Sequence, residues 1–280
     1  MPSEPPITLE QIVAHKRDEV ERAKAQTSLE TLKERIEELG RPRNFFQAVV
    51  KHAGTTDVSV IAEVKRRSPS AGWIRPEYVD AFDPVAIARR YHANGAAAIS
   101  CLTDEAFFSG SNDYVHAIRD AVPLPVLRKD FIIDPWQVWE SRAIGADAIL
   151  LIAECLTEGE LIDLMILARE LQLTTLVEVH SMDNLLKVRP HVGFPSRSYG
   201  LLGINNRNLA TMQTDVAHTL RLVDLVEDPS TLVSESGIRT PDDVDKLRKE
   251  GVRIILVGES LMRTDDPGTA LAELLGRRPN

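Results

Sequence analysis

Residues 58–70 have the sequence Val-Ser-Val-Ile-Ala-Glu-Val-Lys-Arg-Arg-Ser-Pro-Ser, in which a short apolar run is followed at once by charged and polar residues. A short run rich in β-branched residues is typical of a buried strand in a parallel sheet. An open, doubly wound sheet that binds a dinucleotide would place a glycine-rich turn after this strand, and residues 63–70 contain no glycine. The stretch therefore favours a closed barrel over an open sheet.

From this strand onward the chain alternates regularly between short apolar runs and helical patterns. We predict strands over residues 58–64, 97–102, 125–127, 148–152, 174–179, 201–204, 231–233 and 254–257. We predict helices over residues 84–94, 112–121, 135–144, 158–171, 182–188, 214–226, 241–250 and 267–275. Asp-Pro and Thr-Pro pairs at several of the helix starts place a capping side chain before a first-turn proline, and glycines follow several ends.

The strand–helix repeats predict an α/β protein that forms a single (β/α)8 TIM barrel with an N-terminal helical extension. We assign residues 1–45 to the extension, which packs on the barrel, and residues 46–280 to the catalytic barrel. Residues 8–39 are predicted to form two helices that break near Thr27 and Ser28, and Thr8 and Gln11 have the spacing of a capping box. This pair is expected near the end of the barrel where the strands finish, called the mouth below. Two roles are open for this pair: a solvated helical hairpin docked on the barrel, or a cover for the mouth.

Composition limits the classes of function. The chain of 280 residues has a net charge of −9, which argues against nucleic-acid binding through phosphate neutralisation. No continuous apolar run is long enough to span a membrane, and residues 1–6 do not resemble a signal peptide, so a cytoplasmic location is expected. Cys101 and Cys155 are expected to be packing residues, and no Cys/His spacing indicates a metal site.

Chemically active side chains follow several of the strands. In a barrel of this kind the active site forms at the carboxyl ends of the strands. Those ends carry a lysine–glutamate cluster of Glu63, Lys65, Lys129, Glu178 and Glu235. Each member alone would usually be an ion pair at the mouth, and His180 is interpreted as a loop histidine. Together they would be costly to bury unless they pair with one another or take part in the chemistry of the site. Such groups are suited to acid–base catalysis.

Small residues follow the last two strands. Ser236 and Gly237 come after the seventh strand, and Gly258 and Ser260 after the eighth. Glycines at this position let backbone N–H groups approach a ligand, and barrels commonly bind phosphate there. We therefore predict a phosphate site at these four residues.

Taken together, the motifs resemble indole-3-glycerol-phosphate synthase. They span nearly the whole chain in barrel order and lie at residues 8–16, 61–70, 127–134, 177–180, 203–209, 234–238 and 257–262. The resemblance implies a small phosphorylated substrate, 1-(2-carboxyphenylamino)-1-deoxyribulose 5-phosphate. It implies as products indole-3-glycerol phosphate, carbon dioxide and water, in tryptophan biosynthesis, with no cofactor. A monomer or weak homo-oligomer is expected.

The resemblance also implies roles for individual residues. Lys129 would be the general acid that protonates the sugar carbonyl, a step that an ammonium with a pKa near neutral can perform. Lys65 would hold the anthranilate carboxylate and supply a later proton. Glu178 would be the base or the charge partner during dehydration, and Glu63 and Glu235 would orient the lysines and the substrate amine.

The remaining roles concern binding. Asn205 and Arg207 would contact sugar hydroxyls or neighbouring carboxylates, and residues Ser68, Pro69 and Ser70 would belong to a mobile loop. Phe108 and Phe131 would form an apolar bed for the anthranilate ring. The stretch 189–199 lengthens the loop before the sixth strand, on the side away from the mouth. Two roles are open for it: a surface loop or a contact between subunits.

Three other functions are weighed. Phosphoribosylanthranilate isomerase resembles this pattern in its phosphate site. It uses a cysteine after strand one and an aspartate after strand six, where this chain has Glu63 with Lys65 and Asn205. A Schiff-base aldolase would need one desolvated lysine, for which Lys129 is the candidate. A non-catalytic phosphate-binding barrel would be expected to lose the lysine–glutamate cluster, which is present here.

Overall fold

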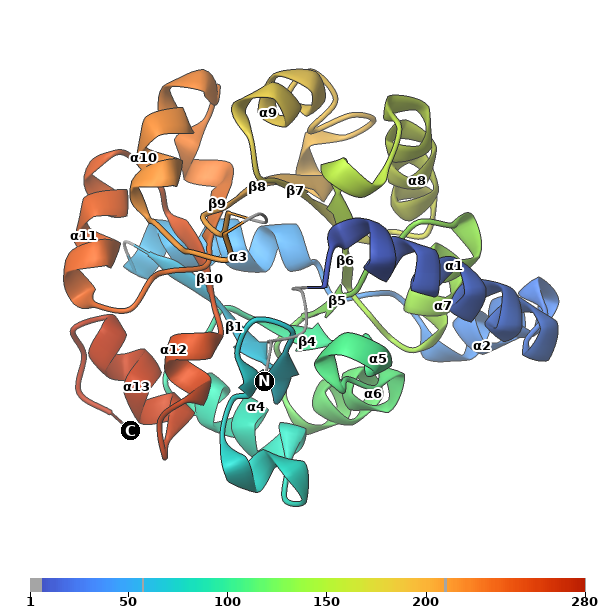
Figure 1. Cartoon of the computed structure of the whole chain (residues 1–280), viewed down its shortest axis with the longest axis horizontal. Coiled ribbons are helices and arrows are strands. Elements are labelled where there is room, and N and C mark those ends of the chain that lie inside the picture. Colours follow the sequence, from blue (N-terminus) through green and yellow to red (C-terminus); the bar gives the residue numbers. More distant parts are fainter. Residues whose placement is uncertain (1–6, 57, 209–210, 280) are drawn as a thin grey trace, which may run out of the picture.

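The computed structural model describes residues 7–56, 58–208 and 211–279 and shows a closed barrel of parallel strands ringed by helices (Figure 1). The barrel strands are β1 (Ser59–Val64), β4 (Ala98–Leu102), β5 (Val126–Lys129), β6 (Ala148–Ile152), β7 (Thr174–Val179), β8 (Gly200–Asn205), β9 (Leu232–Glu235) and β10 (Ile254–Val257). The first strand pairs in parallel with both β4 and the last strand, β10. This closure confirms the predicted barrel and excludes the open sheet.

Side chains alternate between the two faces of each strand, so one face packs against the helices and the other points into the barrel. In β1, Val60, Ala62 and Val64 join the core between strands and helices, whereas Ile61 belongs to the core inside the barrel. Glu63 has the parity of Ile61 and so continues the inward face towards the mouth. The same parity relates Lys129, Glu178, Asn205 and Glu235 to the interior residues Leu127, Leu176, Leu201 and Val233.

The surrounding helices begin and end close to the predicted positions. They are α4 (Pro84–Ala93), α6 (Asn112–Ala121), α7 (Pro135–Ala143), α8 (Glu158–Glu170), α9 (Met182–Val188), α10 (Ala217–Leu222), α11 (Pro241–Lys249) and α13 (Pro267–Leu274). The predicted N-caps of four of them accept hydrogen bonds from the first turn: Asp83, Asp134, Thr240 and Asp266. The helix predicted over 214–226 is shorter, because Thr214 instead pairs with Arg207 in a β-bridge and the helix continues as the 3-10 turn η4 (Val223–Leu225).

The N-terminal pair consists of α1 (Leu9–Gln26) and α2 (Leu29–Leu39), with the predicted capping box at Thr8 and the predicted break at Thr27 and Ser28. Both pack against α7, with Val20, Leu32 and Trp136 forming a small core of their own. Figure 1 shows α1 crossing one side of the barrel beside β5, β6 and α7. Because Leu9 and Ile12 line the cavity described below, this helix lies at the mouth, as predicted.

A further helix, α3 (Phe45–Thr56), was not predicted. Phe45 and Val49 are fully buried in the core inside the barrel, together with Ala98 and Ile254 at the amino ends of their strands. The helix therefore closes the end of the barrel opposite the mouth. Asn44 caps its start, since its Oδ1 accepts from the Gln47 N–H at 2.8 Å, a local signal that could have identified the helix.

The remaining short elements lie in loops. The loop after β1 forms a small hairpin of β2 (Arg67–Ser68) and β3 (Gly72–Trp73) followed by η1 (Pro76–Val79), while α5 (Glu105–Phe108) and α12 (Glu259–Met262) follow β4 and β10. The loop 189–199 ends in η3 (Arg197–Tyr199), and the Tyr199 carbonyl accepts a hydrogen bond from Thr175 at the start of β7, 3.2 Å away. It therefore lies away from the mouth, as expected. The other short turns are η2 (Ala153–Cys155) and η5 (Pro229–Thr231).

Two observations bear on the limits drawn from composition. Cys101 and Cys155 are both free and pack in the two cores, as expected. Within the described residues, no helix is both long and apolar enough to cross a membrane. Residues 1–6, on which the expectation of no signal peptide depends, lie outside the described residues.

Candidate active site

A cavity of about 590 Å³ opens at the mouth of the barrel. Every residue that the sequence assigned to the site lines it. These are Glu63, Lys65, Ser68, Pro69, Ser70, Phe108, Lys129, Phe131, Glu178, Asn205, Arg207, Glu235, Ser236, Gly237, Gly258 and Ser260. The size suits a small organic ligand.

Glu63 and Lys65 form an ion pair at the end of β1. The Lys65 ammonium lies 2.5 Å from Glu63 Oε1, and the glutamate is buried on the inner face of the strand. A Cβ atom on Gly258 would collide with the same Glu63 oxygen. Gly258 therefore leaves the space in which this carboxylate lies, a structural requirement that the sequence did not reveal.

Lys129 lies close to two carboxylates, Glu178 on β7 and Glu235 on β9, strands that β8 separates. Its Nζ is 3.1 Å from Glu178 Oε2 and 3.6 Å from Glu235 Oε2. Burial alone would lower the pKa of Lys129, but the negative charges of Glu178, Glu235 and Glu63 outweigh it and raise this pKa above its ordinary value. The expectation of a near-neutral pKa is wrong for the site as these residues build it, and Lys129 is a fully charged ammonium.

Glu178 is held from two sides. Its Oε1 lies 3.4 Å from His180 Nε2, while its other oxygen faces Lys129. Burial would raise the pKa of Glu178, but Lys129 and His180 outweigh it and lower the value to about 2. Glu178 is therefore a carboxylate across the neutral pH range.

His180 lies directly after β7, in the loop before α9, as expected for a loop histidine. It is buried in the cavity wall, and its Nδ1 lies 3.2 Å from Glu154 Oε2. Glu154 also accepts a hydrogen bond from the His180 backbone N–H and one from Asn184 Nδ2, at 2.8 and 2.9 Å. Burial lowers the pKa of His180, but Glu154 and Glu178 outweigh it and raise this pKa. Glu154 follows β6, so the strand-end rule applied to that strand would have found this pair.

Glu235 is the least compensated member of the cluster. Lys129 lies 3.6 Å from its Oε2, the Glu235 side chain shares a hydrogen bond with Glu178, and a Cβ on Gly203 would collide with Glu235 Oε1. Burial, together with the nearby Glu178 charge, raises the pKa of Glu235 well above its ordinary value of 4.5, despite Lys129. Charging this group is therefore unfavourable in the folded chain.

Glu235→Gln is accordingly expected to stabilise the fold near pH 8 by ~1 kcal/mol, in the range usual for relieving a strained functional site. Because the folded pKa is raised, the protonated form contributes stability that is present below the ordinary pKa of 4.5 and is lost as pH rises through the raised pKa. The amide imitates the protonated form, so the gain should vanish near about pH 4. Urea unfolding of both proteins at the two pH values measures it, and a loss of stability near pH 8 would contradict the shift.

The residues after β9 and β10 form the other side of the cavity. Ser236 and Gly237 both have left-handed backbones, with φ of 66° and 79°. The buried Asn206 fixes this turn, since its Nδ2 donates to the Ser236 carbonyl and to Ser234 Oγ at 3.1 and 3.0 Å. The Ser260 hydroxyl donates to the Ile238 carbonyl at 2.9 Å. Its proton is thus already used, and backbone N–H groups remain as donors, alongside the Arg239 and Arg263 side chains that also line the cavity.

Arg207 ties the β1 loop to the β8 loop. Its guanidinium donates to Ser70 Oγ and to the Met212 carbonyl, at 3.1 and 3.2 Å, and lies 3.4 Å from Glu259. Asn205 Oδ1 accepts from the Arg207 backbone N–H at 3.0 Å, and Asn205 also lines the cavity. Whether the loop with Ser68, Pro69 and Ser70 moves stays a prediction.

Two aromatic rings lie on the opposite side of the cavity from the turn after β9. The ring centroids of Phe108 and Phe131 are 6.2 Å apart and the planes are tilted by 43°. Phe131 follows β5, which lies opposite β9 in the strand order, and Phe108 follows β4, the neighbour of β5 on the side of β1. The cavity thus has an aromatic side and a side built from backbone donors, with the lysine–glutamate cluster between them.

No group of three or more His, Cys, Asp and Glu side chains that could hold a metal ion occurs among the described residues. Sequence reasoning also left out Asp130, Arg239 and Glu259, which line the cavity. Asp130 stands directly after Lys129, and the other two lie within two residues of predicted phosphate-site residues.

Comparison with known proteins gives consistent results. The family described as indole-3-glycerol phosphate synthase matches residues 9–274. A protein of that name from Acidithiobacillus ferrooxidans is 46% identical over 269 residues, covering 95% of this chain and 97% of the relative. A protein of the same name from Rhodospirillum rubrum is 43% identical over 268 residues, covering 96% and 98%.

Solved structures with the same fold are more distant in sequence. A 3-hexulose-6-phosphate synthase superimposes with a TM-score of 0.61 at 12% identity, covering 78% of this chain and 99% of that one. The tryptophan synthase subunit alpha from Legionella pneumophila has a TM-score of 0.56 at 16% identity, covering 83% and 96%. At these identities the likeness shows the barrel fold alone.

Proposed function

The chain belongs to the indole-3-glycerol phosphate synthase family, and from that premise we propose that the cavity at the barrel mouth is its active site. The enzyme is a carboxy-lyase of tryptophan biosynthesis that closes the indole ring on a phosphorylated sugar. The observation that carries the site assignment is the position of the lysine–glutamate cluster between an aromatic side and a side of backbone donors. A substrate with an anthranilate ring at one end and a phosphate at the other matches this order. Residues 1–45 would then be an extension that packs on the catalytic barrel of residues 46–280.

In this arrangement the phosphate binds at Ser236, Gly237, Gly258 and Ser260. The left-handed turn at Ser236 and Gly237 and the first residues of α12 supply N–H groups, since the first N–H groups of a helix have no partner within it. The phosphate is held against the overall negative charge by these local donors rather than by the average field.

The anthranilate ring lies against Phe108 and Phe131, and Lys65 binds its carboxylate. Lys65 is paired with Glu63 at 2.5 Å, so an incoming carboxylate would share this ammonium. The sugar carbonyl then faces Lys129, which protonates the oxygen as the aromatic carbon attacks. Asn205 and Arg207 contact the sugar hydroxyls, and loss of carbon dioxide restores the aromatic ring.

The charge on Lys129 argues against a Schiff-base aldolase. A nucleophilic lysine must be a neutral amine, and the surrounding carboxylates raise the pKa of Lys129. Incubation with the carboxyphenylamino-deoxyribulose phosphate, followed by indole absorbance and fluorescence, tests the proposed reaction directly. Borohydride added during turnover should trap no covalent adduct.

Gly237→Leu is expected to raise KM about 10- to 100-fold while kcat changes little. A left-handed backbone costs a branched residue ~1–3 kcal/mol, and the new Cβ would lie 3.1 Å from Thr214 Cβ. The phosphate contacts persist from ground state to transition state, so their loss affects KM rather than kcat. Gly276→Leu is the matched control, because Gly276 has a φ of 65° and no atom within 4 Å of its Cβ position, and it lies outside the cavity. An unchanged KM in Gly237→Leu would refute the phosphate site.

A further inference from the structure

Lys16 on α1 is a lysine with no exposed surface, although α1 lies at the mouth of the barrel. The motif at residues 8–16 ends at this lysine, and the proposed chemistry gives it no part. A buried lysine is expensive to keep unless its charge is compensated. Its partners therefore indicate what it does.

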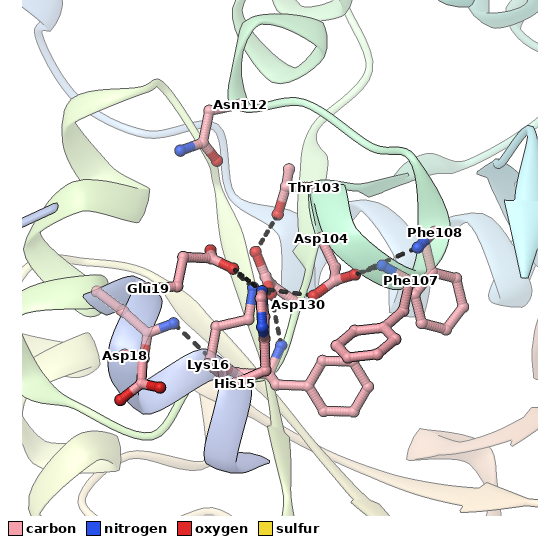
Figure 2. Close-up of polar contacts among 12 residues, drawn as sticks. His15, Lys16, Asp18, Glu19, Thr103, Asp104, Phe107, Phe108, Asn112 and Asp130 are labelled. Carbon is pink, nitrogen blue, oxygen red and sulfur yellow. Dashed lines mark hydrogen bonds and ion pairs between the residues drawn. The ribbon is translucent and has the colours of Figure 1, made fainter. Parts of the chain in front are cut away.

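Three carboxylates surround the Lys16 ammonium (Figure 2). Its Nζ lies 2.9 Å from Glu19 on the same helix, 3.0 Å from Asp104 after β4 and 2.9 Å from Asp130 after β5. Burial would lower the pKa of Lys16, but Asp130, Asp104 and Glu19 outweigh it and raise this pKa. One charge thus joins α1 to the loops that follow two barrel strands.

Asp104 connects Lys16 to the aromatic side of the cavity. Its Oδ1 caps α5 by accepting from the N–H groups of Phe107 and Phe108, at 2.7 and 3.2 Å. Its Oδ2 faces Lys16. Figure 2 also shows His15 beside Phe107, with the ring centroids 5.4 Å apart in an edge-to-face arrangement. The position of Phe108 in the cavity wall is therefore set from α1.

Asp130 makes the second connection. It stands between Lys129 and Phe131 in the chain, and its Oδ1 accepts from the Phe131 N–H at 2.8 Å while it faces Lys16. Thr103 and Arg128 hold its other oxygen, at 2.5 and 3.3 Å. Asp130 is thus fixed on both sides, and two cavity residues flank it.

We propose that Lys16 is a positioning residue that locks α1 onto Asp104 and Asp130 and thereby fixes Phe108 and Phe131 as the binding surface for the anthranilate ring. The proposal rests on the proposed function, which assigns the ring to this side of the cavity. It makes α1 part of the binding site: Leu9 and Ile12 cover the cavity, and Lys16 follows Ile12 by four residues, one helical turn further along.

The test compares two probes, anthranilate and inorganic phosphate, on wild type and Lys16→Met. We expect the dissociation constant of anthranilate to rise about tenfold or more, because small displacements of positioning groups have effects of this size. Phosphate binding should stay within about twofold, because none of the three Lys16 partners belongs to the proposed phosphate site. Lys16→Arg keeps the charge and should recover most of the anthranilate affinity.

Lys24→Met is the matched control on the same helix. Lys24 pairs with Asp134 at 2.6 Å and with Glu21 at 3.0 Å and does not line the cavity. It should lower the melting temperature without changing the affinity for either probe. An equal loss of affinity for both probes in Lys16→Met would overturn the proposal, because general loosening of the fold weakens both binding sites alike. Unchanged affinity for both probes would overturn it as well.

Lys16→Met leaves Asp104 and Asp130 buried without this cation, and such a loss is strongly destabilising. If the variant does not fold, the double variant Lys16→Met with Asp104→Asn is used instead, because it removes one of the two buried carboxylates that Lys16 had neutralised. This double variant should still bind anthranilate weakly, and wild-type affinity would overturn the proposal. Failure of Gly237→Leu to weaken phosphate binding would instead contradict the phosphate assignment and leave this comparison unaffected.

Discussion

Lys129→Met is expected to lower kcat about 10²- to 10⁴-fold, while the dissociation constant of a non-reactive substrate analogue changes much less. The proposed proton transfer from Lys129 is made only in the transition state, so its loss falls on kcat. Single-turnover rates measured by indole fluorescence, with analogue binding measured in parallel, separate the two quantities. Full single-turnover activity would show that another group, with Lys65 as the first candidate, is the general acid.

Lys65→Met is the informative comparison, because it removes a lysine from the same cavity. Its proposed contact with the substrate carboxylate exists in the bound ground state, so this variant should weaken analogue binding as well as slow turnover. The two effects need not add, since each lysine lies beside a glutamate whose protonation its removal would change. Equal analogue binding in both variants would contradict the division of roles.

The fold and the membership of the cavity wall could be predicted from the sequence because both depend on local periodicity. Strand parity alone directs Glu63, Lys129, Glu178, Asn205 and Glu235 to the inside of the barrel, and the rule that strands end at the mouth brings them together. Cap residues marked the helix starts for the same local reason. The helix α3 was not predicted, because the burial of its apolar side chains depends on a barrel end that only the closed structure creates.

The electrostatics could not be predicted in this way. The pKa of Lys129 rises because three carboxylates from different strands surround it, and their distances follow from closure of the barrel rather than from spacing in the sequence. The same holds for His180, whose partner Glu154 lies 26 residues away, and for Lys16, whose partners Asp104 and Asp130 come from two other strand ends. The sequence shows each of these residues alone, whereas the fold pairs them with partners from other strand ends.

The low pKa of Glu178, about 2, makes it a weak base while Lys129 is charged. The geometry resolves this difficulty. When Lys129 gives its proton to the substrate oxygen, the cation 3.1 Å from Glu178 disappears, and the pKa of this carboxylate rises because only His180 then opposes the effect of burial. We infer that the acid step prepares the base for the later dehydration, with His180 keeping the carboxylate in place.

Glu178→Gln should therefore lower the rate of indole formation about 10²- to 10³-fold, within the usual range for loss of a general base, and should do so after ring closure. In a single turnover, carbon dioxide release should run ahead of indole fluorescence, whereas Lys129→Met should delay both together. Glu158→Gln is the matched control, because Glu158 also contacts a histidine, His191 at 2.8 Å, but is exposed and outside the cavity. It should leave both signals unchanged. Simultaneous carbon dioxide release and indole formation in Glu178→Gln would mean that Glu178 acts before ring closure is complete. The order in which Lys129 and Glu178 act would then be wrong, because the carboxylate would be needed while its neighbouring ammonium is still charged.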